Sequence, residues 1–379
     1  LKNILMLDFN SIYKFYYEWW KNIDKTLFIL IIFLFSLGLF FSLVSTSLIA
    51  SDKLDTNNYF FFFKHFLYIL IGITVLIFFS SLSKENLFKI SFYLFFISLF
   101  FLFLVPVLGT EVKGSKRWLN LFFLPRFQPI ELVKPFIIIF IATILCSEKN
   151  FNIYFKYLLT FISILPACLL LMMQPDIGQT LLIFLAWAIL VFISGISLPI
   201  ILTFFSFSLL SLIYVVFFIT KFAYIKNRIL SFFNPNNGTH NFQSDKAIDA
   251  ISSGGYFGKG IGEGTLKSRV PEAHTDYIIS VISEEFGVVA IVLLLILFLF
   301  FIYTIFQKIY LEKSEKIKLV LTGTVCLIVF QVLIHIGVNI RLFPTTGMTL
   351  PFLSYGGSSI VGVSILSGII LNLTKREID

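Results

Sequence analysis

The sequence predicts an all-α integral membrane protein with about ten transmembrane helices, and two observations support this. Hydrophobic residue types make up 58% of the 379 residues and charged types only 13%. Such a chain has too few polar residues to cover the surface of a soluble domain. The apolar residues also form successive runs of about 20, the length that a helix needs to cross the hydrocarbon core of a bilayer.

Ten such runs can be placed along the chain. The breaks after the fifth and sixth runs are short, at Gln174 to Asp176 and at Gly195, and they predict tight hairpins. The runs cover residues 27–50, 59–83, 88–108, 130–147, 154–173, 177–194, 197–219, 286–309, 317–340 and 354–373. We therefore expect one membrane domain over 27–373, between an N-terminal segment, 1–26, and a tail, 374–379.

The orientation follows from the basic residues of the short loops. With a cytoplasmic N-terminus, most of these Lys and Arg residues lie on the cytoplasmic side, as the positive-inside rule requires. Both termini are then cytoplasmic, and the first 26 residues do not have the pattern of a cleaved signal peptide. We expect an uncleaved, multi-pass protein of the cytoplasmic (inner) membrane. The loops 109–129 and 220–285 lie outside, and their basic character suggests an anionic ligand.

The large outer loop, 220–285, joins the seventh and eighth predicted helices. Its segments YIKNRILSFFNP and DKAIDAISSGG resemble short amphipathic helices at the membrane surface. The stretch SGGYFGKGIGEGT favours a tightly turning backbone with glycines at positive φ. It is not a Walker A loop, because Lys259 is followed by glycine. An approach of its amides and Lys259 to a pyrophosphate remains an alternative.

The motif PEAHTD, residues 271–276, places several titratable groups beside apolar sequence, where a charge is costly and calls for a reason. This cluster of titratable groups predicts a catalytic role for the motif. Alternatively, Thr275 or Asp276 caps the helix that follows. His274 is either a proton partner or a hydrogen-bonding neighbour. Glu284 and Glu285 are interpreted as the polar face of an interfacial helix.

Two cations precede the fourth run, and a charge pair lies at its start. Lys116 and Arg117 stand before Trp118 and are either snorkelling cations at the membrane interface or a clamp for a lipid-linked phosphate. Glu131 and Lys134 are three residues apart, on one helical face, and we expect them to pair. The pair is either a structural salt bridge or part of the wall of a polar cavity.

The segment PTTGMTLPFLSYGGSS, residues 344–359, joins the last two runs. Its hydroxyls could serve a sugar-binding cavity, or its small residues could simply pack helices together. The polar hairpin QPDIGQ, residues 174–179, is expected to pack beneath that cavity. The hydroxyl residues concerned are Thr345, Thr346, Ser354, Ser358 and Ser359.

Taken together, these segments resemble the SEDS family of peptidoglycan polymerases, and its cell-division branch more than its elongation branch. GSKRWL, QPIELVKP, PDIGQTLL, SGGYFGKGIGEG, PEAHTDYIISVISEEFG and PTTGMTLPFLSYGGSS occur in the family's order. VSTSLIA and FFKHFLYILIG, nearer the N-terminus, also resemble it. Ile130, Tyr277 and Thr346 depart from residues that are common in the family.

The resemblance implies a glycosyltransferase that polymerises lipid II at the outer face of the membrane, for septal wall synthesis, and releases undecaprenyl pyrophosphate. The implied partners are a class B penicillin-binding protein transpeptidase, other division proteins and membrane lipids, with no nucleic acid. The essential acid of the family falls on Asp276, which chemistry suggests is a general base. The predicted substrate-binding residues are Lys116, Arg117, Gln128, Glu131, Lys134, His274, Ser354 and Ser358.

No cofactor or metal site is assigned, and a divalent cation, Mg²⁺ or Mn²⁺, is left open as a partner of the leaving group. Three other functions also stay open: a lipid II flippase, an elongation-type polymerase and a noncatalytic scaffold for division proteins.

Overall fold

The computed structural model describes residues 9–53, 59–112, 115–121, 125–148, 151–219, 222–233 and 242–375. Within these ranges the chain is helical apart from its loops and one small hairpin, β1 (Thr110–Val112) paired antiparallel with β2 (Ser115–Trp118). The helices are α1 (Phe9–Asn22), α2 (Lys25–Lys53), α3 (Phe60–Ser81), α4 (Lys84–Leu108), α5 (Ile130–Leu145), α6 (Ile153–Met173), α7 (Ile177–Ile193), α8 (Leu198–Phe218), α9 (Ala223–Phe233), α10 (Phe242–Gly254), the 3-10 helix η3 (Lys267–Arg269), α11 (Ile278–Leu311), α12 (Glu315–Asn339) and α13 (Gly357–Leu373).

Each of the ten predicted runs coincides with a helix, which confirms the all-α membrane fold. Among the described residues, seven helices are long and apolar enough to cross a membrane, and α7 and α13 are shorter apolar helices. At 1.5 Å per residue, α5, α7 and α13 are only about 25 Å long. The number of helices that cross the membrane remains a prediction.

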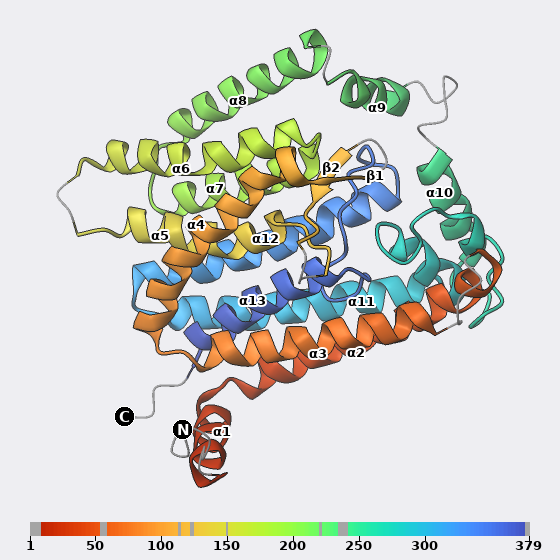
Figure 1. The fold of residues 1–379 in the computed structure, drawn as a ribbon, viewed down its shortest axis with the longest axis horizontal. Helices are drawn as coiled ribbons and strands as arrows, with labels where there is room; N and C mark the ends of the chain where they lie inside the picture. The colour runs from red at the N-terminus through yellow and green to blue at the C-terminus, as the bar shows by residue number, and fades with distance from the viewer. Residues whose placement is uncertain are drawn as a thin grey trace.

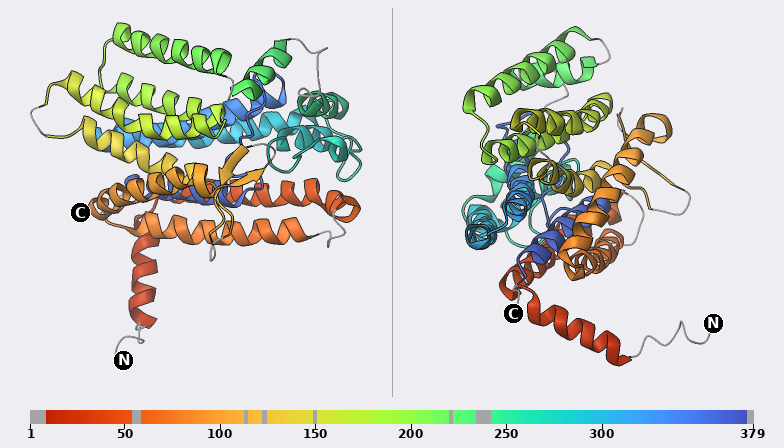
Figure 2. Two further views of the ribbon diagram at one scale, coloured as in Figure 1. Left: turned by 45° about the horizontal axis from the view of Figure 1, so that its top comes forward. Right: turned by 90° about the vertical axis from the view of Figure 1, so that its left-hand side faces the viewer.

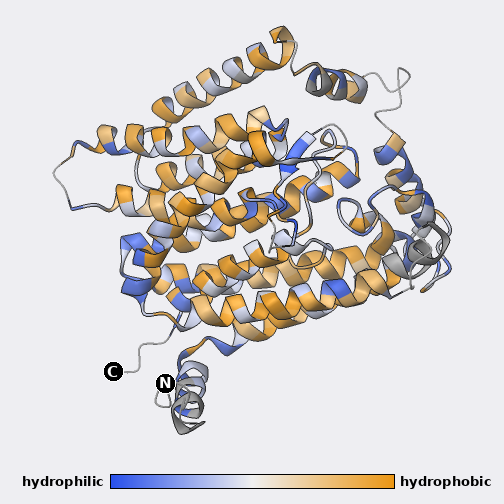
Figure 3. Cartoon of the chain, viewed as in Figure 1, coloured by the Kyte–Doolittle hydropathy of each residue, from blue (hydrophilic) through white to orange (hydrophobic). Residues whose placement is uncertain are grey.

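Most of the long helices run side by side in one bundle, and α8 lies at an angle along its edge (Figure 1). Helix α1 projects away from the bundle (Figure 2). Helices α12 and α13 are buried along most of their length, and α13 packs along α3 and α5. Hydrophobic residues cover the long helices, whereas hydrophilic ones gather at the ends of the bundle and beside β2 (Figure 3). The C-terminal end of α13 lies towards one end of the bundle, and the hairpin, α9 and α10 lie towards the other (Figure 1).

The large loop has the local structure that its sequence indicated. Helices α9 and α10 coincide with the two predicted amphipathic segments. The glycine-rich stretch turns through Gly255, Gly258, Gly260 and Gly262, all at positive φ. None of its residues lines the cavity described below. Its possible approach to a pyrophosphate therefore gains no support from its position.

Helix α11 starts earlier than the predicted span, at Ile278, and breaks at Gly287, where φ is 77°. The break has a packing reason. The amides of Val288 and Val289 donate to the carbonyls of Gly255 and Tyr256, at 3.0 and 3.1 Å. The glycine-rich stretch is thereby hydrogen-bonded to the kink, and a Cβ on Gly287 would collide with it.

The interpretation of Glu284 and Glu285 as the polar face of an interfacial helix is wrong, because both side chains are buried, at 0% and 1% exposure. Glu284 accepts hydrogen bonds from the amides of Leu266 and Lys267, at 2.8 and 2.6 Å. Glu285 accepts one from the amide of Gly262 and pairs with the buried Lys267 ammonium, each at 2.5 Å. The two carboxylates hold the loop against α11.

Candidate active site

A polar cavity of about 770 Å³ lies where the hairpin, the loop before α11 and the segment between α12 and α13 meet. Its wall also includes residues of α3, α5 and α7, so it unites parts of the chain that are far apart in sequence. The charged and amide residues of the wall are Lys64, Arg117, Arg126, Gln128, Glu131, Gln179, Gln243, Glu272 and Asp276.

The cavity brings together five of the nine predicted site residues: Arg117, Gln128, Glu131, Asp276 and Ser358. The other four lie outside its lining. Lys116 is exposed, whereas Lys134 and Ser354 are buried. His274 packs against the rings of Phe61 and Tyr355, with centroids 5.2 and 5.5 Å away. Contact of these nine residues with a substrate stays a prediction.

The loop that carries Asp276 is a tight turn built on one carbonyl. The carbonyl of Glu272 accepts hydrogen bonds from the amides of Thr275, Asp276 and Tyr277. Glu272 itself has φ of 55°, which is uncommon for a residue with a side chain. Such strained positions concentrate at functional sites and require support from their surroundings.

The predicted capping of α11 by Thr275 or Asp276 is wrong. Tyr277 is the N-cap residue, and no side chain caps the helix. Thr275 bonds Glu272 instead, at 3.3 Å to its carbonyl and 3.2 Å to its carboxylate. Because the turn holds the backbone in this way, the Asp276 side chain is part of the cavity wall rather than a helix cap.

Opposite Asp276 stands Gly347, whose φ is 73°. A Cβ at this glycine would lie 3.6 Å from Asp276 Oδ2 and 3.4 Å from Arg117 Nη1. The carboxylate and the guanidinium therefore converge on the same point of the wall. A carboxylate beside a cation in a polar cavity is an arrangement suited to proton transfer near an anionic group.

Arg117 is held by the hairpin that joins α6 to α7. Its Nε and Nη2 donate to the carbonyls of Gln174 and Pro175, at 3.3 and 2.6 Å, and Nη1 lies 3.6 Å from Asp176 Oδ2. Gln128 Nε2 donates to the same carboxylate oxygen, at 3.3 Å. Burial raises the pKa of the Asp176 carboxyl, and Arg117 opposes that rise. The guanidinium is thus fixed in place as well as charged.

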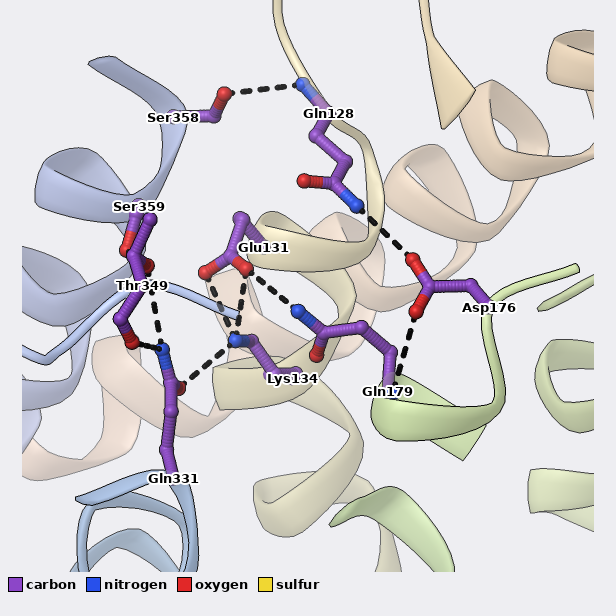
Figure 4. Close-up of polar contacts among 9 residues, drawn as sticks. All are labelled: Gln128, Glu131, Lys134, Asp176, Gln179, Gln331, Thr349, Ser358 and Ser359. Atoms are coloured by element: carbon purple, nitrogen blue, oxygen red, sulfur yellow. Dashed lines mark hydrogen bonds and ion pairs between the residues drawn. The ribbon is translucent and has the colours of Figure 1, made fainter. Parts of the chain in front are cut away.

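The predicted pairing of Glu131 with Lys134 is confirmed, with Nζ 2.9 and 2.8 Å from the two carboxylate oxygens. The pair is part of a larger network (Figure 4). Gln179 Nε2 donates to Glu131 Oε1 at 3.1 Å, and Lys134 Nζ donates to Gln331 Oε1 at 3.1 Å. Glu131 lines the cavity and Lys134 lies behind it, so a buried network supports this part of the wall.

Two cations of the wall escaped the sequence analysis. Lys64 and Arg126 line the cavity, and within the described part of the chain neither forms an ion pair with a carboxylate. Arg126 lies over the ring of Trp118, at 5.4 Å from its centroid. Lys64 stands inside the segment FFKHFLYILIG, and Arg126 lies between GSKRWL and QPIELVKP. Nothing in the spacing of those segments showed that the two residues face the cavity.

The fold defines a multi-pass helical membrane protein whose cavity is lined by charged, polar and apolar side chains. A family model described as "Cell cycle protein", covering FtsW, RodA and SpoVE, matches residues 25–378. The chain belongs to this family, and the predicted SEDS resemblance is confirmed.

Named relatives and solved structures agree with this. The chain is 31% identical to the probable peptidoglycan glycosyltransferase FtsW of Caulobacter vibrioides, over 95% of this chain and 91% of that protein. It is 33% identical to the corresponding Nitrosomonas europaea protein, over 93% and 92%. A chain of a solved peptidoglycan synthase complex superposes with a TM-score of 0.76 at 27% identity, covering 93% of this chain and 97% of that one. The RodA structure of Thermus thermophilus gives 0.67 at 27%, covering 93% and 96%.

Proposed function

We propose that this protein is a peptidoglycan glycosyltransferase that polymerises lipid II into glycan strands during cell division. Its family and the names of its relatives support the activity and the division role. The observation that carries the chemistry is the convergence of the Asp276 carboxylate and the Arg117 guanidinium in one polar cavity.

In this proposal Asp276 is the general base. The acceptor's sugar hydroxyl gives its proton to the carboxylate as its oxygen attacks the anomeric carbon of the donor. The bond from that carbon to the pyrophosphate oxygen breaks in the same displacement, and undecaprenyl pyrophosphate leaves. A single displacement inverts the configuration at the anomeric carbon and needs no covalent enzyme intermediate.

Cations of the cavity wall stabilise the charge that develops on the leaving group. Arg117 Nη1 approaches the same point of the wall as Asp276 Oδ2. Lys64 and Arg126 are better placed than Lys116, which is exposed outside the lining. A guanidinium can bond phosphate oxygens in pairs, whereas an ammonium acts as a point charge.

The lipid tail of the substrate has a matching surface. Leu67 and Ile71 of α3 line the cavity, yet 57% and 47% of their surface remains exposed. The cavity therefore reaches the apolar outside of the bundle along α3. A polyprenyl chain can lie there while the sugars and the pyrophosphate occupy the polar part.

A divalent cation fits this site only together with the substrate. The described residues contain no group of three or more His, Cys, Asp or Glu side chains that could hold a metal ion. Mg²⁺ is usually bound by one or two carboxylates together with substrate phosphates. Glu272 also lines the cavity, and its carboxylate is not needed as the base. We therefore assign Glu272 as the protein ligand of such an ion. The ion would add positive charge at the leaving group.

The proposed setting is the outer face of the cytoplasmic membrane, with cytoplasmic termini. Because a solved neighbour belongs to a peptidoglycan synthase complex that coordinates polymerization and crosslinking, we propose that this chain acts with a class B penicillin-binding protein transpeptidase.

The test is polymerisation of lipid II by the purified full-length protein in detergent, with and without its cognate transpeptidase. Glycan polymer formed without a sealed bilayer is the expected result. Movement of lipid II across reconstituted vesicles without any polymer in detergent would instead support the flippase. Because flipping needs no base, dependence of the activity on Asp276 also separates the two functions.

A further inference from the structure

Helix α12 carries a line of polar side chains that the mechanism above does not use. Gln331, His335 and Asn339 are spaced four residues apart and so lie on one face of the helix. All three are at most 2% exposed. Buried polar groups in a membrane helix are costly and are retained where they make specific contacts.

Each of the three reaches a loop of the cavity. Gln331 Nε2 donates to the carbonyl of Thr349 at 2.9 Å, and His335 Nδ1 lies 2.8 Å from the carbonyl of Met348. Asn339 Nδ2 donates to the carbonyl of Asp276 at 3.1 Å. One helical face is therefore bonded both to the wall beside Gly347 and to the turn that carries Asp276.

The backbone of that turn is held at three consecutive carbonyls. The carbonyl of His274 accepts from the amide of Tyr355, at 3.0 Å, and that of Thr275 accepts from Ser354 Oγ, at 2.6 Å. The Asp276 carbonyl accepts from Asn339. Of these three donors, only Asn339 belongs to a helix, and it is the one bonded to the residue that carries the carboxylate.

We propose that Asn339 is a positioning residue for Asp276, and that Gln331 and His335 hold the facing wall in register with it. This inference rests on the proposed function, in which Asp276 is the base. A rigid helix bonded to both walls sets the distance between the carboxylate and the substrate's reacting atoms. Displacement of a catalytic group by about 1 Å can cost about 100-fold in rate.

The test compares Asn339→Leu with Thr324→Val in the full-length protein. Thr324 is a matched control, because it is buried on the same face of α12, seven residues before Gln331. Its hydroxyl donates to the Leu321 carbonyl of its own helix, at 2.8 Å. For Asn339→Leu we expect kcat for lipid II polymerisation to fall about 100-fold, with KM changed by no more than about twofold. Thr324→Val should leave both constants within about twofold of wild type.

Hydrogen–deuterium exchange supplies a readout that does not depend on activity. The amides of residues 275–277 are bonded to the Glu272 carbonyl. Asn339→Leu should therefore increase exchange in the peptide covering 271–277 by about tenfold and leave the rest of α11 and α12 unchanged. Thr324→Val should not increase exchange in that peptide.

The outcomes separate this inference from the proposed function. An inactive wild-type protein rejects the polymerase, while the exchange experiment still tests whether Asn339 holds the turn. If wild type is active and Asn339→Leu matches Thr324→Val in both measurements, the positioning role is wrong. Asn339→Ala is the second variant, and failure of both Asn339 variants to fold would assign the residue to stability and overturn the proposal.

Discussion

Two acidic sites lie within ten residues of each other at the start of α11, and they use their carboxylates differently. Glu284 and Glu285 are fully buried, and their oxygens bind loop amides and the Lys267 ammonium. Asp276 lines the cavity, and its backbone carbonyl accepts a hydrogen bond from Asn339. Acidic residues beside a membrane helix are therefore not by themselves a sign of chemistry, because the contacts of the oxygens decide their role.

The difference has a physical basis. A carboxylate that accepts several charge-assisted hydrogen bonds in a dry site stabilises the loop that supplies them, and it has no access to a substrate. A carboxylate in the wall of a polar cavity can exchange a proton with a bound molecule. Substitutions at the two sites should therefore affect different properties.

The largest effect on activity is expected for Asp276→Asn. Loss of a general base should lower lipid II polymerisation by about 10²–10⁴-fold, while the melting temperature stays the same. Gel analysis of the glycan product measures the activity. The isosteric control is Glu263→Gln, because Glu263 is an exposed acid of the same loop and does not line the cavity. Wild-type activity in folded Asp276→Asn protein would remove the base assignment.

Glu285→Ala should show the reverse pattern. Removing one partner of a buried ion pair costs about 3–5 kcal/mol, because the Lys267 charge remains buried without compensation. Thermal unfolding in detergent should show a lower melting temperature, and activity should be lost only together with folded protein. The double variant Lys267→Met with Glu285→Leu should recover part of that stability. A stable but inactive Glu285→Ala protein would contradict the comparison.

A smaller effect is expected where a methyl group is added between the two charges of the site. Gly347→Ala places a Cβ near Asp276 Oδ2 and Arg117 Nη1 and adds backbone strain at positive φ. Polymerisation should fall roughly tenfold, comparable to the cost of one misplaced methyl group in a pocket. The control is Gly262→Ala. This variant has similar backbone strain, at φ of 87°, but its added Cβ would meet open space, so it should retain activity. An equal loss of activity in the two variants would show that backbone strain, and not the position of the added methyl group, causes the loss.

The smallest effect concerns Asp176, whose pKa is raised by burial above its ordinary value of 3.8. Because the folded state binds this proton more tightly, the stabilisation is present below pH 3.8 and is lost as the pH rises through the folded-state pKa. The melting temperature of wild type, relative to that of Asp176→Asn, should therefore fall as the pH rises above 3.8. A constant difference would show that Asp176 makes no such contribution.

Much of the candidate site was predictable, because short motifs state residue type and local spacing. Asp276, Arg117, Gln128, Glu131 and Ser358 were all singled out and do line the cavity. The pairing of Glu131 with Lys134 followed from helical spacing alone. The predicted cap on α11 was wrong because Thr275 bonds Glu272 in the turn before the helix. The predicted exposure of Glu284 and Glu285 was wrong because the loop at Leu266 and Lys267 folds back onto α11.

The sequence by itself determined the all-α membrane fold, since the length and apolar character of a run decide whether a helix is stable in a bilayer. It also determined which loops are polar and which motifs they carry. Only the tertiary structure decided that Lys64 and Arg126 face the cavity, that Lys116 does not, and that Asn339 holds the Asp276 backbone. These contacts join segments that are up to hundreds of residues apart in the sequence, and they are determined by how whole helices pack against one another.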